Sequence, residues 1–322
     1  MGSGAPAEPS LSPPRRWLVV ANPAAGQGRV ARTLPKLQKR LEALGISYRL
    51  HITEAPGDAA RFLRQQREQD FDLVAVVGGD GTVREAASAL LNADMPLLVV
   101  PLGSGNDFSR VANCNLPWTR VLEAPWQGTR PVRVDVGYAD LDHGREIFVN
   151  GAGVGFDACV VENMPRFRFL KGDLWYLATV LYTFRRFQPP QLRAEDAAGR
   201  PLYDGPALLF SVGNGRYLGG GFHLFPRSSL RDGRLDVSVV SPLGFWNFLK
   251  KLPKVFRGTH LGEPEVLYEQ LEGLQVTLER PFPVQMDGEL PGRTRTLRFG
   301  VLPQALTLWP GCRWPADQPA GA

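Results

Sequence analysis

The sequence predicts an α/β domain with a parallel sheet, followed by an all-β, sandwich-like domain. Strand and helix patterns alternate through the first 130 residues, which is the order of a parallel sheet covered by helices on both faces. After Arg130, short strand-like runs separated by turn residues dominate, as they do in sandwiches and barrels. The 322 residues are enough for two such domains, at roughly 100–200 residues each.

The change of pattern sets the expected domain boundaries. We expect the α/β domain to span residues 15–130 and the β-rich domain to span residues 131–299. Residues 300–312 are expected to return to the first domain and complete it. Residues 1–14 are predicted to be a disordered tail, and residues 313–322 a loose end.

The elements of the first domain follow from apolar spacing. Leucines at helical spacing give Val30–Leu44 one apolar face, and Gly45 stands where a helix-ending glycine belongs. Further helices are predicted from about Gly57 to Gln69 and from Val83 to Leu91. Apolar runs predict strands at Arg16–Ala21, Tyr48–Thr53, Leu73–Val77 and Leu97–Val100.

Two helical segments, Phe169–Phe187 and Pro242–Arg257, interrupt the strands of the second domain. Both carry aromatic residues beside lysine and arginine, which suits either a helix lying on an anionic membrane or a helix packed on the sandwich. Packing is favoured for the first segment, and both interpretations stay open for the second. The predicted strands are Arg133–Gly137, Glu146–Gly151, Ala207–Val212, Arg234–Val240, Leu274–Leu278, Thr296–Val301 and Ala305–Trp309.

Composition narrows the possible functions. With 43% hydrophobic and 21% charged residues, the chain has the composition of a globular protein. The net charge of +5 suits an anionic membrane or a phosphorylated ligand, and without a nucleic-acid-binding motif we expect no nucleic-acid partner. Cys114, Cys159 and Cys312 lack metal-site spacing and are expected to be unpaired in a reducing cytoplasm. No stretch looks transmembrane and the first residues do not form a signal peptide, so a cytoplasmic location is expected.

Glycine-rich loops follow three of the predicted strands, where an open parallel sheet binds its ligand. The first loop, Asn22–Gly28, precedes a helix whose amides would face a phosphate. Its Gly26-x-Gly28-x-x-Ala31 pattern loosely matches a dinucleotide fingerprint. However, four residues separate the strand from the first glycine, which disfavours a nicotinamide dinucleotide.

The second and third loops each add a carboxylate. Taken alone, Gly79–Thr82 predicts an ordinary tight turn. A turn alone would leave the charge of Asp80 without a role in a buried crevice. Beside a nucleotide, Asp80 would hold Mg²⁺ or its water shell while amides and Thr82 bind phosphate oxygens. The third loop, Pro101–Phe108, offers a serine hydroxyl and Asp107, although its Asn-Asp pair equally suits a helix cap.

Together, Asn22-Pro-x-x-Gly26, Gly79-Asp-Gly-Thr-x-x-Glu85 and Pro101-Leu-Gly-Ser-Gly-Asn-Asp-Phe108 resemble the catalytic domain of the diacylglycerol kinase family. The sequence is most similar to the bacterial soluble lipid kinases, which are related to sphingosine and ceramide kinases. The resemblance implies an NAD kinase/diacylglycerol kinase-like fold with its active site in the interdomain cleft, and ATP and Mg²⁺ as cofactors. It implies transfer of the γ-phosphate to a hydroxyl of a lipid at a membrane surface. Diacylglycerol, giving phosphatidic acid, is the first candidate, before phosphatidylglycerol or a sphingoid base.

The same resemblance implies a structural Mg²⁺ on the Asp232 carboxylate and the backbone carbonyls of Ser229 and Arg234. Oxygen ligands suit this hard cation, although without the resemblance Asp232 would be part of a turn. The nucleotide contacts implied by the resemblance are Asn22, Pro23, Ala24, Ala25, Gly26, Thr53, Gly79, Asp80, Gly81, Thr82, Val83, Arg84, Glu85, Ser104, Asp107 and Asp135.

The resemblance assigns the proton acceptor to the turn Met286–Glu289. A carboxylate near the lipid hydroxyl would take its proton, and the sequence does not choose between Asp287 and Glu289. Without the resemblance, the Asp-Gly pair predicts an exposed hairpin turn.

Other interpretations are disfavoured by particular residues. An NAD kinase shares the GGDGT loop but lacks the pattern Leu102–Asp107. An inactive lipid-binding protein would be expected to have lost some of its carboxylates. The glycine-rich segments Asn150–Asp157 and Gly213–Gly215 are predicted to be tight turns between strands, and the oligomeric state stays open. The carboxylates retained are Asp80, Asp107, Asp135, Asp287 and Glu289.

Overall fold

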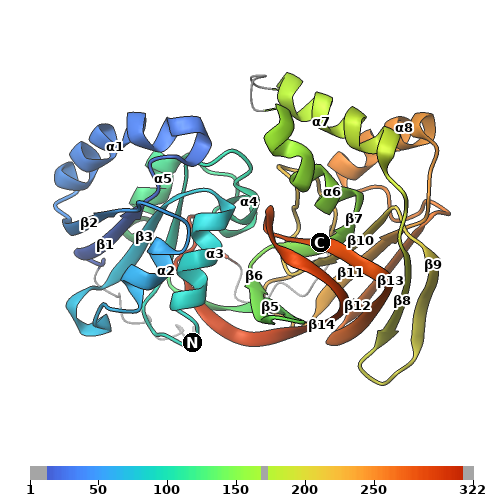
Figure 1. Ribbon diagram of the computed structural model, residues 1–322. Helices are drawn as coiled ribbons and strands as arrows, with labels where there is room; N and C mark the ends of the chain where they lie inside the picture. The colour runs from blue at the N-terminus through green and yellow to red at the C-terminus, as the bar shows by residue number, and fades with distance from the viewer. Residues whose placement is uncertain (1–12, 168–172, 315–322) are drawn as a thin grey trace, which may run out of the picture.

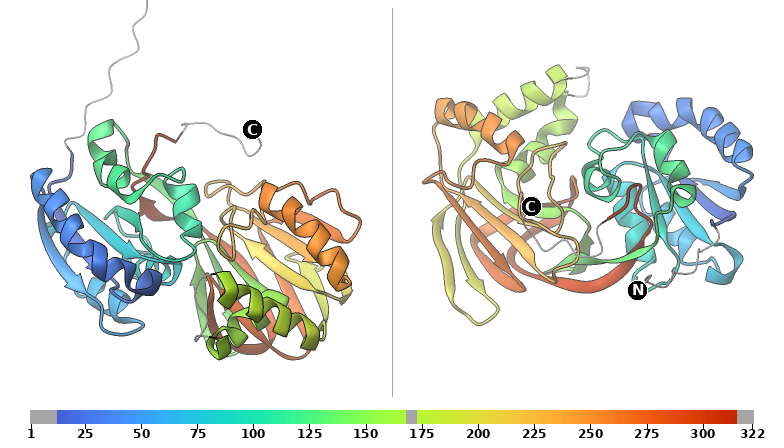
Figure 2. Two further views of the ribbon diagram at one scale, coloured as in Figure 1. Left: turned by 90° about the horizontal axis from the view of Figure 1, so that it is seen from above. Right: turned by 180° about the vertical axis from the view of Figure 1, so that it is seen from behind.

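The computed structural model describes residues 13–167 and 173–314. The predicted tails therefore lie almost entirely outside the described residues, as does the start of the helix predicted from Phe169. Two lobes stand side by side, and one continuous mixed sheet of 14 strands runs through both (Figure 1). The views in Figure 2 show the same division from above and from behind.

The first lobe contains a parallel sheet in the order β2 (Ser47–Ile52), β1 (Arg16–Ala21), β3 (Leu73–Gly78) and β4 (Leu97–Pro101). Every residue of β3 is buried, as are all residues of β1 except the first. Continuous apolar strands are typical of a parallel sheet that helices cover on both faces. The predicted α/β domain is confirmed.

The helices divide between the two faces of this sheet. Side chains of β1 alternate between the faces, so its odd-numbered residues pack under α1 and α5, and its even-numbered residues under α2 and α3. A short helix, α4, follows β4. The bounds are α1 (Ala25–Ala43), α2 (Asp58–Leu63), α3 (Asp80–Ala89), α4 (Asp107–Ala112) and α5 (Trp118–Glu123).

The second lobe is antiparallel, and its core contains Phe148, Phe210 and Phe299. Its main sheet path runs β12-β11-β10-β7-β13-β14. Within the described ranges, no helix is long and apolar enough to cross a bilayer. The elements are β5 (Val132–Leu141), β6 (Gly144–Phe148), β7 (Gly151–Gly155), α6 (Phe156–Asn163), α7 (Asp173–Arg186), β8 (Gln191–Asp196), β9 (Pro201–Pro206), β10 (Leu209–Gly213), β11 (Leu235–Val240), α8 (Phe245–Arg257), β12 (Val266–Leu271), β13 (Gly273–Met286) and β14 (Glu289–Leu308).

Strand β14 joins the two lobes. Its first part pairs with β13, its later part with β5, and Leu308 pairs in parallel with Leu97 of β4 (red in Figure 1). A register shift lies between Leu302 and Leu306, where Gln304 has a φ of 50°. Beyond this bend, Leu306 and Leu308 are fully buried in the core of the first lobe. The end of the chain thus returns to the first sheet.

The glycine-rich segment after Asn150 differs from its prediction. The prediction of a tight turn is wrong, because Gly151–Gly155 forms the buried strand β7. A Cβ at Gly153 would collide with the carboxylate of Asp157. Glycine here makes room for a buried side chain within a sheet. The prediction also missed β8, β9 and β12, none of which contains a long apolar run.

The cysteines also differ from their prediction. Cys114, after α4, and Cys312, at the end of the chain, form a disulfide across 198 residues of sequence. The prediction of three unpaired cysteines is therefore wrong, and only Cys159 is free. Neither cysteine has a neighbouring partner in the sequence, so their spacing could not reveal a contact made by the fold.

We expect Leu308→Ala to lower the free energy of unfolding by about 2–5 kcal/mol, because the substitution opens a cavity where the two sheets meet. Leu290→Ala is the matched control, since Leu290 lies on the same strand but is 38% exposed. Urea unfolding of both variants provides the comparison. If the two variants lost equal free energy of unfolding, β14 would not join the lobes through its buried end.

Candidate active site

The three glycine-rich loops meet at the carboxyl ends of the parallel strands. The Asn22 amide donates a hydrogen bond to the Thr82 hydroxyl over 3.0 Å, which ties the first loop to the second. A Cβ at Gly103 would collide with the backbone of Gly79, and one at Gly26 with the carbonyl oxygen of Leu102. The loops therefore touch backbone to backbone, and glycine is required for that approach.

Two carboxylates, Asp80 and the more deeply buried Asp107, lie close together at these loops. Asp80 accepts a hydrogen bond from the backbone N–H of Phe108 over 3.0 Å. Burial raises the pKa of Asp80, and burial together with the charge of Asp80 raises the pKa of Asp107 to about 6. Oδ1 of Asp107 is buried without a hydrogen bond, although the Arg110 guanidinium lies 3.7 Å away. A cation placed here would relieve the repulsion between the two carboxylates.

Residues of the second lobe also contact these carboxylates. The Asn150 amide donates to Asp80 over 3.4 Å, and the backbone N–H of Gly220 donates to Asp107 over 2.7 Å. Sequence reasoning missed both contacts. Asn150 was part of the segment interpreted as a turn, and the backbone of Gly220 carries no sequence signal of its own.

The acidic turn between β13 and β14 separates its two carboxylates. Asp287 is 6% exposed, and its side chain accepts hydrogen bonds from the backbone N–H groups of Val149, Asn150 and Gly151 over 2.7, 2.9 and 3.1 Å. Burial raises the pKa of Asp287 to about 7, against the lowering effect of these bonds. Its carboxylate is therefore bound to the protein backbone.

Glu289 extends toward the first lobe instead. Its side chain is 46% exposed and pairs with the guanidinium of Arg84, which also lies 3.5 Å from Glu146. A Cβ at Gly81 would collide with the carboxylate of Glu289. The structure thus brings the acidic turn and the second glycine loop into direct contact across the two lobes.

Two of the predicted nucleotide contacts, Asp135 and Glu85, have carboxylates that accept hydrogen bonds from the protein backbone. Both carboxylate oxygens of Asp135 accept backbone hydrogen bonds over 2.8 Å, from Gly233 and from Gln304 at the bend in β14. The carboxylate of Glu85 accepts from Gly57 and Ala59 and so caps α2. These two carboxylates position neighbouring segments of the chain.

The remaining predicted residues line the same edge of the sheet. Thr53 follows β2 and donates its backbone N–H to Ala21, while Ser104 is exposed at the tip of the third loop. The side chain of Val83 is buried in the core, so only its backbone is available to a ligand. Pro23, Ala24 and Ala25 form the turn between β1 and the regular part of α1.

The predicted metal loop is held by Asp135. The loop residue Asp232 accepts a hydrogen bond from the backbone N–H of Arg234 over 3.0 Å. Burial, with the charge of Asp135, raises the pKa of Asp232. In the part of the chain that the structure describes, no three His, Cys, Asp or Glu side chains gather as a metal-binding group. A metal ion at this loop would therefore depend on backbone carbonyls.

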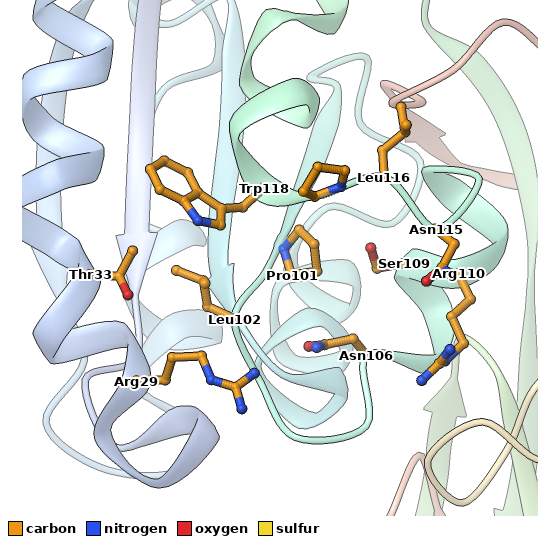
Figure 3. A pocket seen from close by; sticks show the side chains of 11 residues that line it. Arg29, Thr33, Pro101, Leu102, Asn106, Ser109, Arg110, Asn115, Leu116 and Trp118 are labelled. Carbon is orange, nitrogen blue, oxygen red and sulfur yellow. The ribbon is translucent and has the colours of Figure 1, made fainter.

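A hollow of about 430 Å³ lies beside the third glycine loop (Figure 3). Arg29 and Arg110 carry its positive charges, and Trp118 forms an apolar wall. The Arg29 guanidinium donates to the carbonyl of Gly103 over 3.3 Å, which ties it to the loop backbone. The two guanidinium groups favour an anionic group nearby. Sequence reasoning did not include either arginine among the site residues.

Comparison with known proteins identifies the family. Residues 16–139 match the diacylglycerol kinase catalytic domain, and residues 151–309 match the YegS C-terminal NAD kinase beta sandwich-like domain. A probable lipid kinase YegS-like protein of Pseudomonas aeruginosa is 32% identical over 265 residues, which cover 81% of this chain and 84% of that protein. The diacylglycerol kinase of Bacillus subtilis is 26% identical over 283 residues, covering 86% of this chain and 91% of that protein.

The fold agrees with this assignment. It is similar to the crystal structure of a diacylglycerol kinase from Bacillus anthracis, with a TM-score of 0.68 and 24% identity over 93% of this chain and 98% of that chain. The two matched domains correspond to the two lobes. The chain belongs to the YegS-like lipid kinases, phosphotransferases that combine a diacylglycerol kinase catalytic domain with a β-sandwich-like second domain.

Proposed function

We propose that the chain transfers the γ-phosphate of ATP to a hydroxyl of a membrane glycerolipid, with diacylglycerol as the first candidate and phosphatidic acid as its product. The observation that carries this proposal is the position of Glu289. It reaches from the second lobe to the glycine turn at Gly81 and pairs there with Arg84. A phosphate on one lobe and a hydroxyl on the other would meet at this point.

The glycine loops supply the nucleotide side of the reaction. We propose that the phosphates lie along the backbone of Gly79–Thr82, with Ser104 as a further hydroxyl contact. Asp80 and Asp107 would hold Mg²⁺, since the two carboxylates lie close enough for the charge of Asp80 to raise the pKa of Asp107, and carboxylate oxygens suit this cation. When bound, Mg²⁺ neutralises phosphate charge. A second Mg²⁺ at Asp232, with the carbonyls of Ser229 and Arg234, would be structural.

Glu289 then acts as the proton acceptor. The lipid hydroxyl oxygen attacks the γ-phosphorus, the bond from phosphorus to the oxygen of the leaving ADP breaks, and the hydroxyl proton passes to the Glu289 carboxylate. Asp287 is a poorer candidate because three backbone N–H groups already occupy its carboxylate. We propose instead that Asp287 anchors the turn that carries Glu289.

Helices α7 and α8 would bring the second lobe to the membrane. They lie along the same side of this lobe (Figure 1), and Phe184 of α7 contacts Phe245 and Phe248 of α8. These contacts give the two helices a shared inner face. Their outer surface nevertheless exposes apolar side chains: Leu177 is 51% exposed, Leu181 40%, Trp246 72% and Phe256 50%.

Two cations of α8 form ion pairs. The other two are exposed and support an orientation with α8 against the membrane. Lys251 and Lys254 pair with glutamates, so they do not supply the basic surface that the sequence suggested. Lys250 and Arg257 are exposed, and helical spacing places both on the face that carries Trp246. Exposed tryptophan beside cations suits the interface of an anionic membrane. Because ATP is cytoplasmic, we propose that this is the inner face of the membrane.

The lipid is tested by transfer of labelled γ-phosphate to vesicles containing diacylglycerol, phosphatidylglycerol, sphingosine or ceramide, with NAD in a separate assay. We expect labelled phosphatidic acid as the product. We also expect Glu289→Gln to lower turnover by about 10²–10⁴-fold, because the proton acceptor is lost. Binding of a fluorescent ATP analogue should remain within about twofold. Glu279→Gln, an exposed change on β13, is the control. Label only in NAD would contradict lipid transfer, and full activity of Glu289→Gln would contradict its role.

The burial of Asp287, which raises its pKa, predicts that the stability of the protein depends on pH. Since its pKa is raised to about 7 from 3.8, its contribution is fully present below the unfolded-state pKa and is lost as the pH rises through 7. Asp287→Asn cannot titrate. We therefore expect the difference in unfolding free energy, wild type minus variant, to fall by about 1 kcal/mol between about pH 6 and pH 8. Urea unfolding checks this, and a constant difference would place Asp287 in contact with solvent.

The membrane face is tested by sedimentation with vesicles containing phosphatidylglycerol. Trp246→Ala should weaken binding about tenfold, because an exposed aromatic side chain no longer enters the interface. Trp126→Ala on the first lobe is the control and should leave vesicle binding unchanged. If wild-type protein shows no preference for anionic over neutral vesicles, or if the two variants behave alike, α7 and α8 do not form the contact surface.

A further inference from the structure

Gln285 of β13 is buried and connects Asp157 with Gly288, two residues that the proposed reaction does not use. It is 2% exposed, and its amide nitrogen donates to Oδ2 of Asp157 over 3.0 Å. Its amide oxygen accepts from the backbone N–H of Gly288 over 3.1 Å. Gly288 immediately precedes Glu289, so one buried amide links helix α6 to the turn that carries the proposed proton acceptor.

The turn needs this support. Met286 pairs with Glu289, which leaves Asp287 and Gly288 as a two-residue hairpin loop with φ values of 48° and 82°. Without Gln285, the N–H of Gly288 would lose its hydrogen-bond partner within the protein. Asp287 is held on one side of the turn by residues 149–151, and Gln285 holds the other side.

Asp157 determines which way the Gln285 amide faces. An ionised carboxylate only accepts hydrogen bonds, so it selects the amide nitrogen and directs the amide oxygen toward Gly288. Burial raises the pKa of Asp157 to about 6, which leaves it mostly ionised at neutral pH. The neighbouring strand accommodates the contact because Gly153, which pairs with Gln285, has no side chain to block Asp157.

We propose that Asp157 and Gln285 are positioning residues that fix the direction of Glu289 by way of the Gly288 N–H. The inference rests on the proposed role of Glu289 as the proton acceptor. It also explains the glycine at position 153, since the absence of a side chain there admits the carboxylate that orients the amide.

A charge swap tests this arrangement without changing side-chain volume. Gln285→Glu places two carboxylates in contact, so at neutral pH we expect kcat to fall about tenfold or more with KM for ATP nearly unchanged. Asp157→Asn in that background restores a donor facing an acceptor, and kcat should recover to within about threefold of wild type. A double variant no better than Gln285→Glu alone would overturn the proposal.

Hydrogen exchange gives a second readout that does not depend on catalysis. Gln285→Met removes both bonds, so peptides covering residues 285–290 of the full chain should exchange about tenfold faster than in wild type. Gln275→Met, an exposed change on the same strand, should not alter them. Unchanged exchange in Gln285→Met would overturn the positioning role even if the kinase is active. A wild-type protein without lipid kinase activity but with faster exchange in this variant would refute the proposed function and leave the positioning intact.

Discussion

The arrangement of the site depends on one strand belonging to both lobes. β14 begins at Glu289, against the glycine turn of the first lobe, and its end pairs with β4 in the parallel sheet. Both ends of this strand contact the first lobe, Glu289 through its ion pair with Arg84 and Leu308 through its pairing with β4. The bend at Gln304 is held by Asp135, whose second oxygen holds the loop of the proposed metal. One buried carboxylate therefore couples the shared strand to that loop.

The acidic groups near the site differ in what surrounds them. Asp135 and Asp287 are bound by backbone N–H groups, so their carboxyl oxygens fix the shape of the chain. The charge of Asp80 raises the pKa of its neighbour Asp107, and a bound cation would relieve the repulsion between them. Glu289 stays accessible and pairs with Arg84. We therefore propose that these carboxylates differ in role, anchoring, cation binding or proton transfer, because they differ in their partners.

The sequence predicted the α/β domain and the three loops well because these features are local. Apolar runs predicted the parallel strands within about a residue, and glycines after strands predicted loops that come together because parallel strands end at one edge. The different surroundings of Asp287 and Glu289 could not be predicted, since Asp287 is bound by the distant residues 149–151. The predictions for the two bonded cysteines and for strand β7 were wrong for the same reason, because each feature depends on residues far away in the sequence.

The central claim is that a phosphate held by the glycine loops faces Glu289. A crystal structure with Mg²⁺ and a non-hydrolysable ATP analogue tests it most directly. The account predicts that the terminal phosphate lies along Gly79–Thr82, on the side of the loops that Glu289 approaches. A terminal phosphate seated instead in the hollow between Arg29 and Arg110, out of reach of Glu289, would contradict it.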